Sequence, residues 1–439
     1  MFSIEKAAEH LSRAVQFPTV SYQDPKKMDA AVFSSFETFL EESYPLLHQK
    51  LSKRVINGHG LLFHWPGKSS DKSVLLTAHY DVVPADAKGW PFPPFSGQIH
   101  EGKVYGRGSF DDKSSLIAIL EAVTACLEEE LIPAVDIYLA FGFDEEVGGA
   151  EGAAKIAEYF EEEGLRFDFV LDEGGAVADG SMMGISKPVA VIGIAEKGNS
   201  SFRLQFHGEG GHSSTPPAET AVSEMARFIR EVQAHPQRPH LTETVKAMLK
   251  ATAPYHPGIQ RFILAQPDLF EPLLVRVLMK NRQTAAMLRT TTAFTMAEGG
   301  ISHNVLPTEA SCTLNLRILQ GDSIQKAIAR LESFGIPFEL SPIMREEATK
   351  ASDLESKAME GLRRSIARIF PDAVITPYLM VGSTDCRHYE KVARNSYRFQ
   401  PVRVSEKELA LMHGKGEYLS LDNLETMVSF YRDLIKNLS

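Results

Sequence analysis

The chain has 439 residues, of which 44% are hydrophobic and 23% charged, and its formal net charge is −11. This composition is typical of a soluble globular protein with two domains, and the negative charge argues against nonspecific nucleic-acid binding. Three scattered cysteines without a CxxC pair favour a reducing compartment over a disulfide framework. The N-terminus lacks a signal-peptide core and no apolar run reaches about 18 residues, so we expect a cytoplasmic protein without a stable membrane anchor.

The first third of the chain alternates between strands and helices. Buried strands are predicted within residues 73–83, 134–146 and 167–175, because short apolar runs there are bounded by polar turns. Helices are predicted within 104–130 and 151–164; in the first, Leu116, Ile119 and Leu120 recur at helical spacing. This order predicts an α/β domain with a mixed, mostly parallel sheet.

The pattern changes near residue 198. From there the chain reads as strand, helix, strand, strand, helix, strand, which is the order of a ferredoxin-like α+β domain. A mostly helical insertion is predicted at about 236–289, and the α/β character returns at about 345. We therefore predict one discontinuous α/β domain, residues 1–197 and 345–439, with a smaller domain, residues 198–344, inserted into it.

Acids and histidines follow the predicted strands of the first domain. They are His79 and Asp81, Asp111 and Asp112, Asp144, Glu145 and Glu146, Asp172 and Glu173, and, late in the chain, Asp385 and His388. Ligands of open α/β sheets bind outside the carboxyl ends of the strands, so these groups are expected to converge. Clustered carboxylates repel one another unless a cation neutralises them. Mixed histidine and carboxylate ligands suit zinc, with manganese or cobalt as alternatives, and two ions would share one carboxylate.

The spacing within these motifs suggests individual roles. Asp81 lies two residues after His79 on the same strand face, so it can accept the second ring N–H of a metal-bound histidine. Of the pair Glu145 and Glu146, one acid can bind metal while the other takes a proton from the attacking water. Each motif alone is ordinary, since acids also favour solvated helix starts. Their occurrence at consecutive strand ends favours a metal site.

Eight motifs resemble the M20 metallopeptidase family, which includes aminoacylase-1, carboxypeptidase G2 and succinyl-diaminopimelate desuccinylase. They are HYDVVP, GWPFPPFSG, VYGRGSFDDK, DEEVGG, LDEGG, GHSSTPP, NVLP and GSTDCRHY, in the family's order over nearly the whole chain. EKG at 196–198, RTTTAFT at 289–295 and YRFQP at 397–401 resemble the carboxypeptidase S and PM20-domain N-fatty-acyl-amino-acid hydrolase branch. The resemblance implies a zinc-peptidase-like catalytic domain and an inserted lid or dimerisation domain.

The resemblance also implies roles for the strand-end residues. His79 would be a ligand, Asp81 its supporting acid, and Asp111 the carboxylate bridging two ions, with a peptide after it that is often cis. Glu145 would be the general base and Glu146 a ligand. In LDEGG the ligand is either Asp172 or Glu173, with the aminoacylase-1 pattern favouring Glu173, and His388 would be the last ligand.

The inserted domain contributes residues by the same resemblance. His212 would help to stabilise the oxyanion, in many members from the partner subunit, and Asn304 and Arg317 would contact substrate. Arg387 could pair with a substrate carboxylate through its planar fork or form a structural salt bridge. Family members form homodimers through the inserted domain, a contact that the insertion at 236–289 could reshape.

The combined expectation is a two-metal zinc hydrolase that cleaves peptides or N-acyl amino acids with a free C-terminal carboxylate. A dipeptidase, desuccinylase or deacetylase specificity on the same site is the first alternative, and a catalytically silent metal-binding scaffold a distant one. The apolar run at 261–279 could line an acyl pocket, but its helical spacing favours a packed helix.

Overall fold

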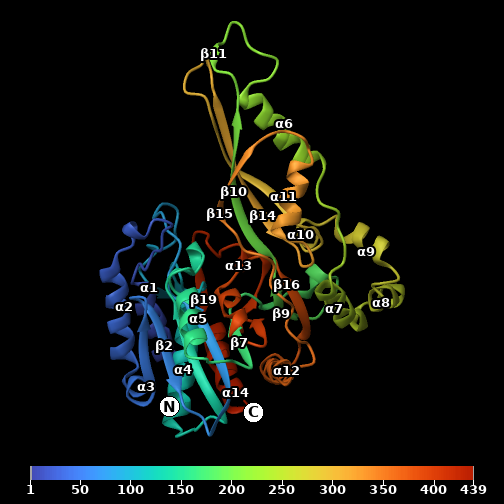
Figure 1. Cartoon of the computed structure of the whole chain (residues 1–439). Coiled ribbons are helices and arrows are strands. Elements are labelled where there is room, and N and C mark those ends of the chain that lie inside the picture. Colours follow the sequence, from blue (N-terminus) through green and yellow to red (C-terminus); the bar gives the residue numbers. More distant parts are fainter. Residues whose placement is uncertain (1, 439) are drawn as a thin grey trace. The chain divides into compact units, whose positions relative to one another are not determined.

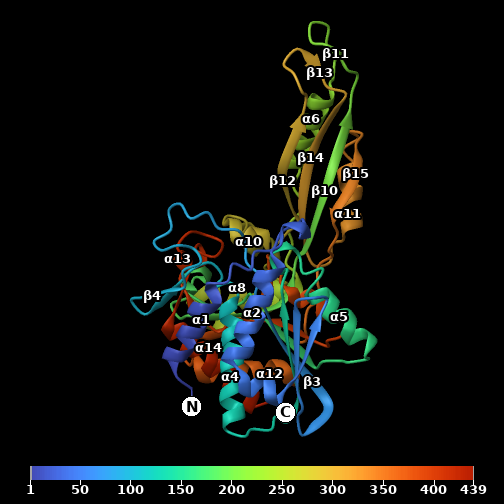
Figure 2. The ribbon, with the colours of Figure 1, turned by 90° about the vertical axis from the view of Figure 1, so that its left-hand side faces the viewer.

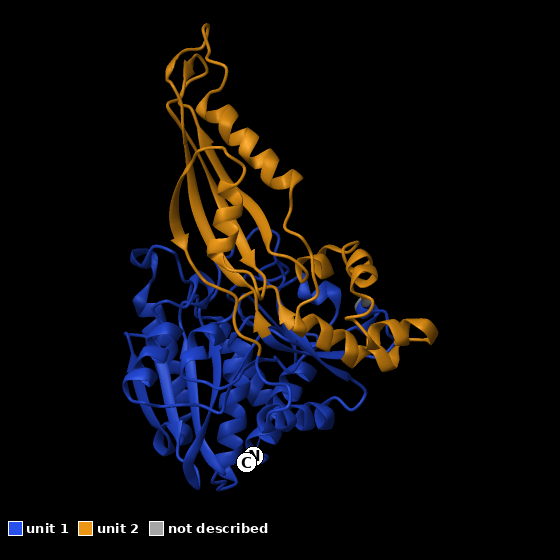
Figure 3. Cartoon of the chain, turned by 45° about the vertical axis from the view of Figure 1, so that its right-hand side comes forward, with its two compact units in different colours: residues 1–194, 352–378, 384–439 blue, residues 195–351, 379–383 orange. Residues whose placement is uncertain are grey.

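The structure is a computed structural model that describes residues 2–438, so residues 1 and 439 of the predicted discontinuous α/β domain lie outside the described part. The chain divides into two compact units, coloured blue and orange in Figure 3. Unit 1 comprises residues 1–194, 352–378 and 384–439, and unit 2 comprises residues 195–351 and 379–383. The sequence predicted the boundaries at 197/198 and 344/345.

A large mixed sheet forms the centre of unit 1. Its strands, in spatial order, are β1 (Ser52–Ile56), β2 (Gly60–Trp65), β6 (Val135–Gly142), β3 (Ser69–His79), β7 (Phe169–Asp172), β17 (Ser396–Arg398), β9 (Val189–Glu196), β8 (Val177–Ala178) and β18 (Arg403–Val404), with β16 (Val374–Met380) paired to β9. The central strands β6, β3, β7 and β17 run parallel, which confirms the predicted fold class. Every residue of β6 is buried, as expected for a parallel strand covered on both faces.

Helices cover both faces of this sheet. The larger core lies beneath α1 (Ile4–Val15), α2 (Ala30–Ser43), α3 (Pro45–Lys50), α4 (Lys113–Glu128), α12 (Lys357–Ile369) and α14 (Leu421–Lys436). α4 contacts α1, α3 and α14, and Figures 1 and 2 show it among these helices. A second core packs α5 (Ala153–Glu162) and the 3-10 helix η5 (Asp385–Lys391) against the sheet.

A small three-stranded sheet joins two distant parts of unit 1. β5 (Lys103–Tyr105) lies between β4 (Gln98–His100) and β19 (Tyr418–Ser420), which follows α13 (Glu406–Leu409). Both pairings are antiparallel, with Tyr105 opposite Tyr418. The segment 413–417, just before β19, is thereby carried to the loop 106–112, just after β5.

Unit 2 contains a four-stranded antiparallel sheet. Its order is β12 (Thr291–Gly299), β14 (Glu309–Ile318), β10 (Gly198–His207) and β15 (Glu339–Met344), and Figure 2 shows these strands side by side. The helices α6 (Ala221–Ala234) and α11 (Ile324–Glu332) share an apolar core with this sheet. A two-stranded sheet, β11 (Gly211–His212) and β13 (Val305–Leu306), extends from it. Strands and helices of unit 2 follow each other in the predicted order. The role of the inserted domain as a lid or dimerisation domain stays a prediction.

The insertion predicted at about 236–289, within unit 2, is helical. Its apolar run at 261–279, however, is not one packed helix. The helices are α7 (Glu243–Thr252), α8 (Gly258–Ala265), α9 (Glu271–Leu278) and α10 (Arg282–Ala286). The single packed helix predicted over 261–279 is wrong: α8 ends at Ala265, and Pro267 in the following turn cannot donate a helical hydrogen bond. No residue of α8 is buried, and Leu274 is the buried residue of α9. Among the described residues, no helix has the length and apolar character needed to cross a membrane.

We predict that Leu120→Ala lowers the free energy of unfolding by about 2–5 kcal/mol, because this fully buried side chain of α4 makes apolar contacts and its truncation leaves a cavity. Urea denaturation followed by circular dichroism measures the loss. Ile132→Ala is the matched control, since that side chain is 57% exposed and its truncation leaves no cavity. Equal losses for the two variants would contradict the described core.

Candidate active site

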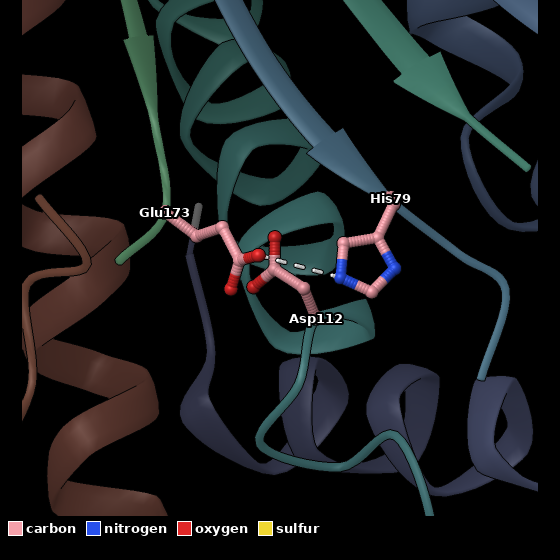
Figure 4. Close-up of side chains that lie close together, drawn as sticks. All are labelled: His79, Asp112 and Glu173. Carbon is pink, nitrogen blue, oxygen red and sulfur yellow. Dashed lines mark ion pairs between the residues drawn. The ribbon is translucent and has the colours of Figure 1, made fainter. Parts of the chain in front are cut away.

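The parallel strands bring the predicted acids and histidines to one edge of the unit 1 sheet. Two groups of three residues there place a possible ligand atom of each member within 4.8 Å of the others: His79, Asp112 and Glu173, and Asp111, Glu146 and His413. Figure 4 shows the first group, with His79 at the end of β3, Asp112 at the start of α4 and Glu173 just after β7, all directed at one another. Strand ends that are 94 residues apart in the chain thus share one site.

Asp111 connects the two groups through its two carboxylate oxygens. Its Oδ1 lies 3.1 Å from Nε2 of His79, and its Oδ2 lies 3.0 Å from Nε2 of His413. Each histidine also faces a glutamate: Glu173 Oε1 is 3.5 Å from His79 Nε2, and Glu146 Oε2 is 3.0 Å from His413 Nε2. One carboxylate therefore lies between two similar sets of ligand atoms. The Asp111–Asp112 peptide is cis, the isomer that the family resemblance implied.

Asp81 holds both His79 and the turn that carries the two glutamates. Its Oδ1 lies 3.3 Å from Nδ1 of the buried His79, on the side of the ring away from Asp111. The same carboxylate accepts the backbone N–H groups of Glu145 and Glu146, each at 3.1 Å, and the hydroxyl of Ser21 at 2.6 Å. A histidine held at one nitrogen by a buried carboxylate presents the other nitrogen in a fixed direction.

Burial and mutual repulsion raise the pKa of most carboxylates in the cluster. Burial, with the charge of Asp111 next to it, raises the pKa of Glu173 to about 8. Burial also raises the pKa of Glu145 well above its usual range, and the charges of Glu173, Asp385 and Glu146 add to the effect. Burial acts the same way on Asp111, but hydrogen bonds from the two histidines outweigh it and lower its pKa. The cluster accordingly favours positive charge at its centre.

His413, and not His388, completes the second group. His388 lies in η5, where its Nε2 is 2.9 Å from the carbonyl oxygen of Gly148, and it belongs to neither group. The assignment of His388 to the site is therefore replaced by His413, which the pairing of β19 with β5 carries to Asp111. The signal in the sequence was the motif HGKGE at 413–417, a histidine followed by two glycines and a glutamate and outside the predicted strand ends.

The structure also separates the two acids of LDEGG. Glu173 belongs to the first group, whereas the Oδ1 atom of Asp172 accepts the backbone N–H of Glu173 at 2.9 Å. Asp112, to which the sequence assigned no role, faces Glu173 and His79. The Oδ1 atom of Asp112 accepts a hydrogen bond from the side-chain amide of Gln400 at 3.0 Å. The preference for Glu173 over Asp172 thus agrees with the geometry.

Two of the residues predicted in the inserted domain lie next to each other in unit 2. His212 pairs with Val305 across β11 and β13, and Asn304, the residue just before β13, accepts the backbone N–H of Ser213. His212 is exposed, and its Nδ1 lies 2.8 Å from the hydroxyl of Ser214. Both side chains are thus accessible within unit 2.

The two predicted arginines belong to different units. Arg317, on β14 of unit 2, donates from Nη1 to the hydroxyl of Ser383 at 3.2 Å. Arg387 is half-buried in η5 of unit 1, next to His388. Neither belongs to the two groups of ligand atoms.

A buried ion pair holds the two chain segments that meet at the site. Glu417 is fully buried and Arg107 is 3% exposed, and their side chains form an ion pair. The Oε1 atom of Glu417 accepts three backbone N–H groups of the loop 108–111, at 3.0, 3.0 and 3.2 Å. Arg107 donates in turn to the carbonyl oxygen of His413 at 2.9 Å. Sequence reasoning missed this pair, which positions the backbone on both sides of the second group.

Comparison of the sequence with known proteins identifies the family of the chain. The sequence profile described as "Peptidase family M20/M25/M40" matches residues 75–437. The chain belongs to the M20 peptidase family. It is 36% identical to the probable carboxypeptidase S-like 2 of Dictyostelium discoideum, over 98% of this chain and 84% of the relative. It is 33% identical to the human N-fatty-acyl-amino acid synthase/hydrolase PM20D1, over 98% and 87%. The predicted family and branch are confirmed, and this M20 chain is a hydrolytic enzyme.

Solved structures of other M20 proteins share its fold. A metallo-carboxypeptidase from Sulfolobus solfataricus superposes with a TM-score of 0.76 at 19% identity, covering 100% of this chain and 99% of that chain. A dinuclear metal-binding M20 peptidase from Bacillus subtilis superposes with a TM-score of 0.61 at 12% identity, covering 99% and 98%. The architecture of the whole chain is therefore that of the family, in which binding of two metal ions is typical.

We predict that Glu417→Ala lowers the free energy of unfolding by about 3–5 kcal/mol, because it leaves the buried Arg107 charge without its partner. Chemical denaturation in the presence of a chelator measures this effect apart from any metal. Glu360→Ala is the control, because the pair of Glu360 with Arg364 is exposed and 3.9 Å long, and we expect no measurable change. A loss below about 1 kcal/mol for Glu417→Ala would show that the ion pair does not hold these segments.

Proposed function

We propose that this M20 hydrolase is a two-metal amidohydrolase that cleaves N-acyl amino acids, including peptides, that carry a free C-terminal carboxylate. One observation carries the proposal: Asp111 directs one oxygen at His79 and the other at His413. A carboxylate in that position is the group that two ions would share. Sharing it would place one ion near His79 and Glu173 and the other near His413 and Glu146.

The chemistry of these residues fits two divalent ions. Within the described structure, the buried atoms Asp112 Oδ2 and Glu146 Oε1 have no hydrogen-bond partner. Each residue belongs to one of the two groups of possible ligands. Buried carboxylate oxygens are ordinarily paired, and a metal ion satisfies them without adding a protein donor. Histidine and carboxylate together favour zinc, with manganese or cobalt as alternatives. Ions held there would polarise the substrate carbonyl and lower the pKa of the attacking water.

Glu145 is the proposed proton carrier. Asp81 holds the backbone N–H of Glu145 and that of its neighbour Glu146, so one acid can face the metals while the other faces the substrate. Burial raises the pKa of Glu145 above its usual value, and a positioned glutamate is a common general base. It would take a proton from the attacking water and return it to the leaving nitrogen.

The substrate class rests on the relatives and on the predicted contact residues. The relatives are named as a carboxypeptidase and a hydrolase of N-fatty-acyl amino acids, and the substrates of both kinds of enzyme join an acyl group to an amino acid by an amide. Arg317 and Arg387 are the proposed partners of the free carboxylate, His212 of the developing oxyanion, and Asn304 of the substrate. Unit 2 would then act as a lid, or as the contact between two copies of the chain.

We expect Glu145→Gln to lower kcat by about 10²–10⁴-fold on an N-acyl amino acid without lowering the metal content, because glutamine cannot accept the proton. Hydrolysis of a panel of short-chain and long-chain N-acyl amino acids, blocked dipeptides and free dipeptides measures activity and selects among the alternative specificities. Plasma emission spectrometry measures metal per chain. Glu162→Gln, on the exposed end of α5, is the control. Undiminished activity of Glu145→Gln would refute the assignment of the base.

The two candidate histidines are tested separately. His413→Ala is expected to lower the bound metal from about two ions per chain towards one, because it removes the imidazole of one set of ligand atoms. His388→Ala is expected to retain both ions, since its ring faces a backbone carbonyl. The opposite pattern, with metal lost only from His388→Ala, would restore the assignment made from the sequence.

A further inference from the structure

The helical insertion within unit 2, at about 236–289, leaves several large apolar side chains exposed to solvent. Six large residues in and beside α8 and α9 are between 45% and 70% exposed: Tyr255, Ile259, Phe262, Leu269, Leu273 and Val277. We call these six residues the α8–α9 surface. Monomeric soluble proteins rarely leave such a group of large apolar side chains uncovered. The surface therefore indicates contact with something outside the chain.

An aromatic contact joins α8 to the residue that precedes α9. The rings of Phe262 and Phe270 pack edge to face with their centroids 5.7 Å apart. Within α8, Ile259 and Phe262 are three residues apart, and Leu273 and Val277 in α9 are four residues apart. Residues at these spacings lie on one face of a helix, so each helix presents an apolar stripe.

The charged side chains around this surface leave positive charge available. Four exposed cations occur on or just after these helices and form no ion pair among the described residues: Arg261 in α8, Arg276 in α9, Lys280 after α9, and Arg282 at the start of α10. The acids of this stretch are engaged elsewhere. Asp268 lies 2.7 Å from Lys246 and 3.7 Å from Lys250, and Glu271 accepts the backbone N–H of Leu241 at 2.9 Å. The chain as a whole has a charge of −11, so this is a local exception.

We propose that the α8–α9 surface rests on an anionic lipid surface. Amphipathic helices with large apolar residues on one face and free Lys and Arg beside them bind at the boundary between headgroups and acyl chains. Each helix has eight residues, far fewer than a membrane span needs, so the contact is peripheral and reversible. A second copy would oppose the same cations across a symmetric contact, which disfavours this surface as a dimer interface. The inference does not depend on the proposed function.

The test uses the full-length protein and large vesicles in a flotation assay. One vesicle preparation is pure phosphatidylcholine, and the other contains about 30% phosphatidylserine, which supplies the negative surface potential. We expect the protein to partition onto the anionic vesicles at about 0.1 M salt, roughly tenfold more weakly onto neutral vesicles, and more weakly again as salt rises.

Two double variants locate the contact. Leu269→Gln with Leu273→Gln removes apolar surface, and Arg276→Glu with Lys280→Glu reverses the charge; each is expected to lower partitioning about tenfold or more. Ile132→Gln and Lys27→Glu, both exposed and in unit 1, are the matched controls and should bind as the wild type does. Hydrolysis of a water-soluble short-chain substrate should be unchanged in every variant.

Two results would overturn the proposal: wild-type protein that fails to float with anionic vesicles at low salt, or binding that neither double variant weakens. Sedimentation velocity tests the competing occupant. A wild-type dimer that Leu269→Gln with Leu273→Gln converts to a monomer, without vesicle binding, would assign the surface to a contact between copies. Vesicle binding by a chain that hydrolyses no amide substrate would support the lipid surface and refute the proposed function.

Discussion

Electrostatic repulsion among buried acids is the constraint on which the rest of unit 1 depends. The parallel strands β3, β6 and β7 end at one edge of the sheet, and each delivers acids or a histidine there. Such a cluster opposes folding unless positive charge is supplied, because its members are removed from water and lie close together. Among the carboxylates of the two groups of three, Asp111 is the one whose pKa falls, and it is the one that faces two histidines. The geometry thus ties stability and chemistry to the same cation-binding capacity.

Two buried carboxylates next to the cluster fix the positions of the backbone segments that carry its side chains. Asp81 holds a histidine ring and two backbone amides with one carboxylate, and Glu417 holds three backbone amides of the loop 108–111 with one oxygen. Both acids are fully buried, so their hydrogen bonds are not exchanged for water. Side chains that would approach metal or substrate are therefore carried on segments that cannot shift independently. Supporting contacts of this kind set the direction of ligand atoms as much as the ligands themselves do.

In unit 2, unlike most of the cluster in unit 1, several residues of interest are exposed to solvent. The four-stranded sheet of unit 2 packs one face against α6 and α11, whereas His212 on β11 and Asn304 just before β13, two residues with predicted roles in the reaction, are exposed and outside that core. Its helical insertion keeps several large apolar side chains in solvent, and its acid Asp268 is paired while four exposed cations of α8–α10 form no ion pair among the described residues. Stability does not account for that arrangement, since burying the same side chains would contribute more to folding. An external contact does account for it.

The sequence by itself determined the family, the α/β class, and the identities of most acids in the cluster, because these depend on short motifs that follow predicted strands. Spacing alone left Asp172 and Glu173 open, since adjacent side chains differ in direction and not in spacing, and only the family resemblance favoured Glu173. Tertiary structure alone decided that His413 and Glu417 meet Asp111, because that contact depends on the pairing of β19 with β5, about 300 residues apart. It also decided that α8 and α9 are exposed. Helical periodicity shows that a face is apolar, but only packing shows whether the protein covers it.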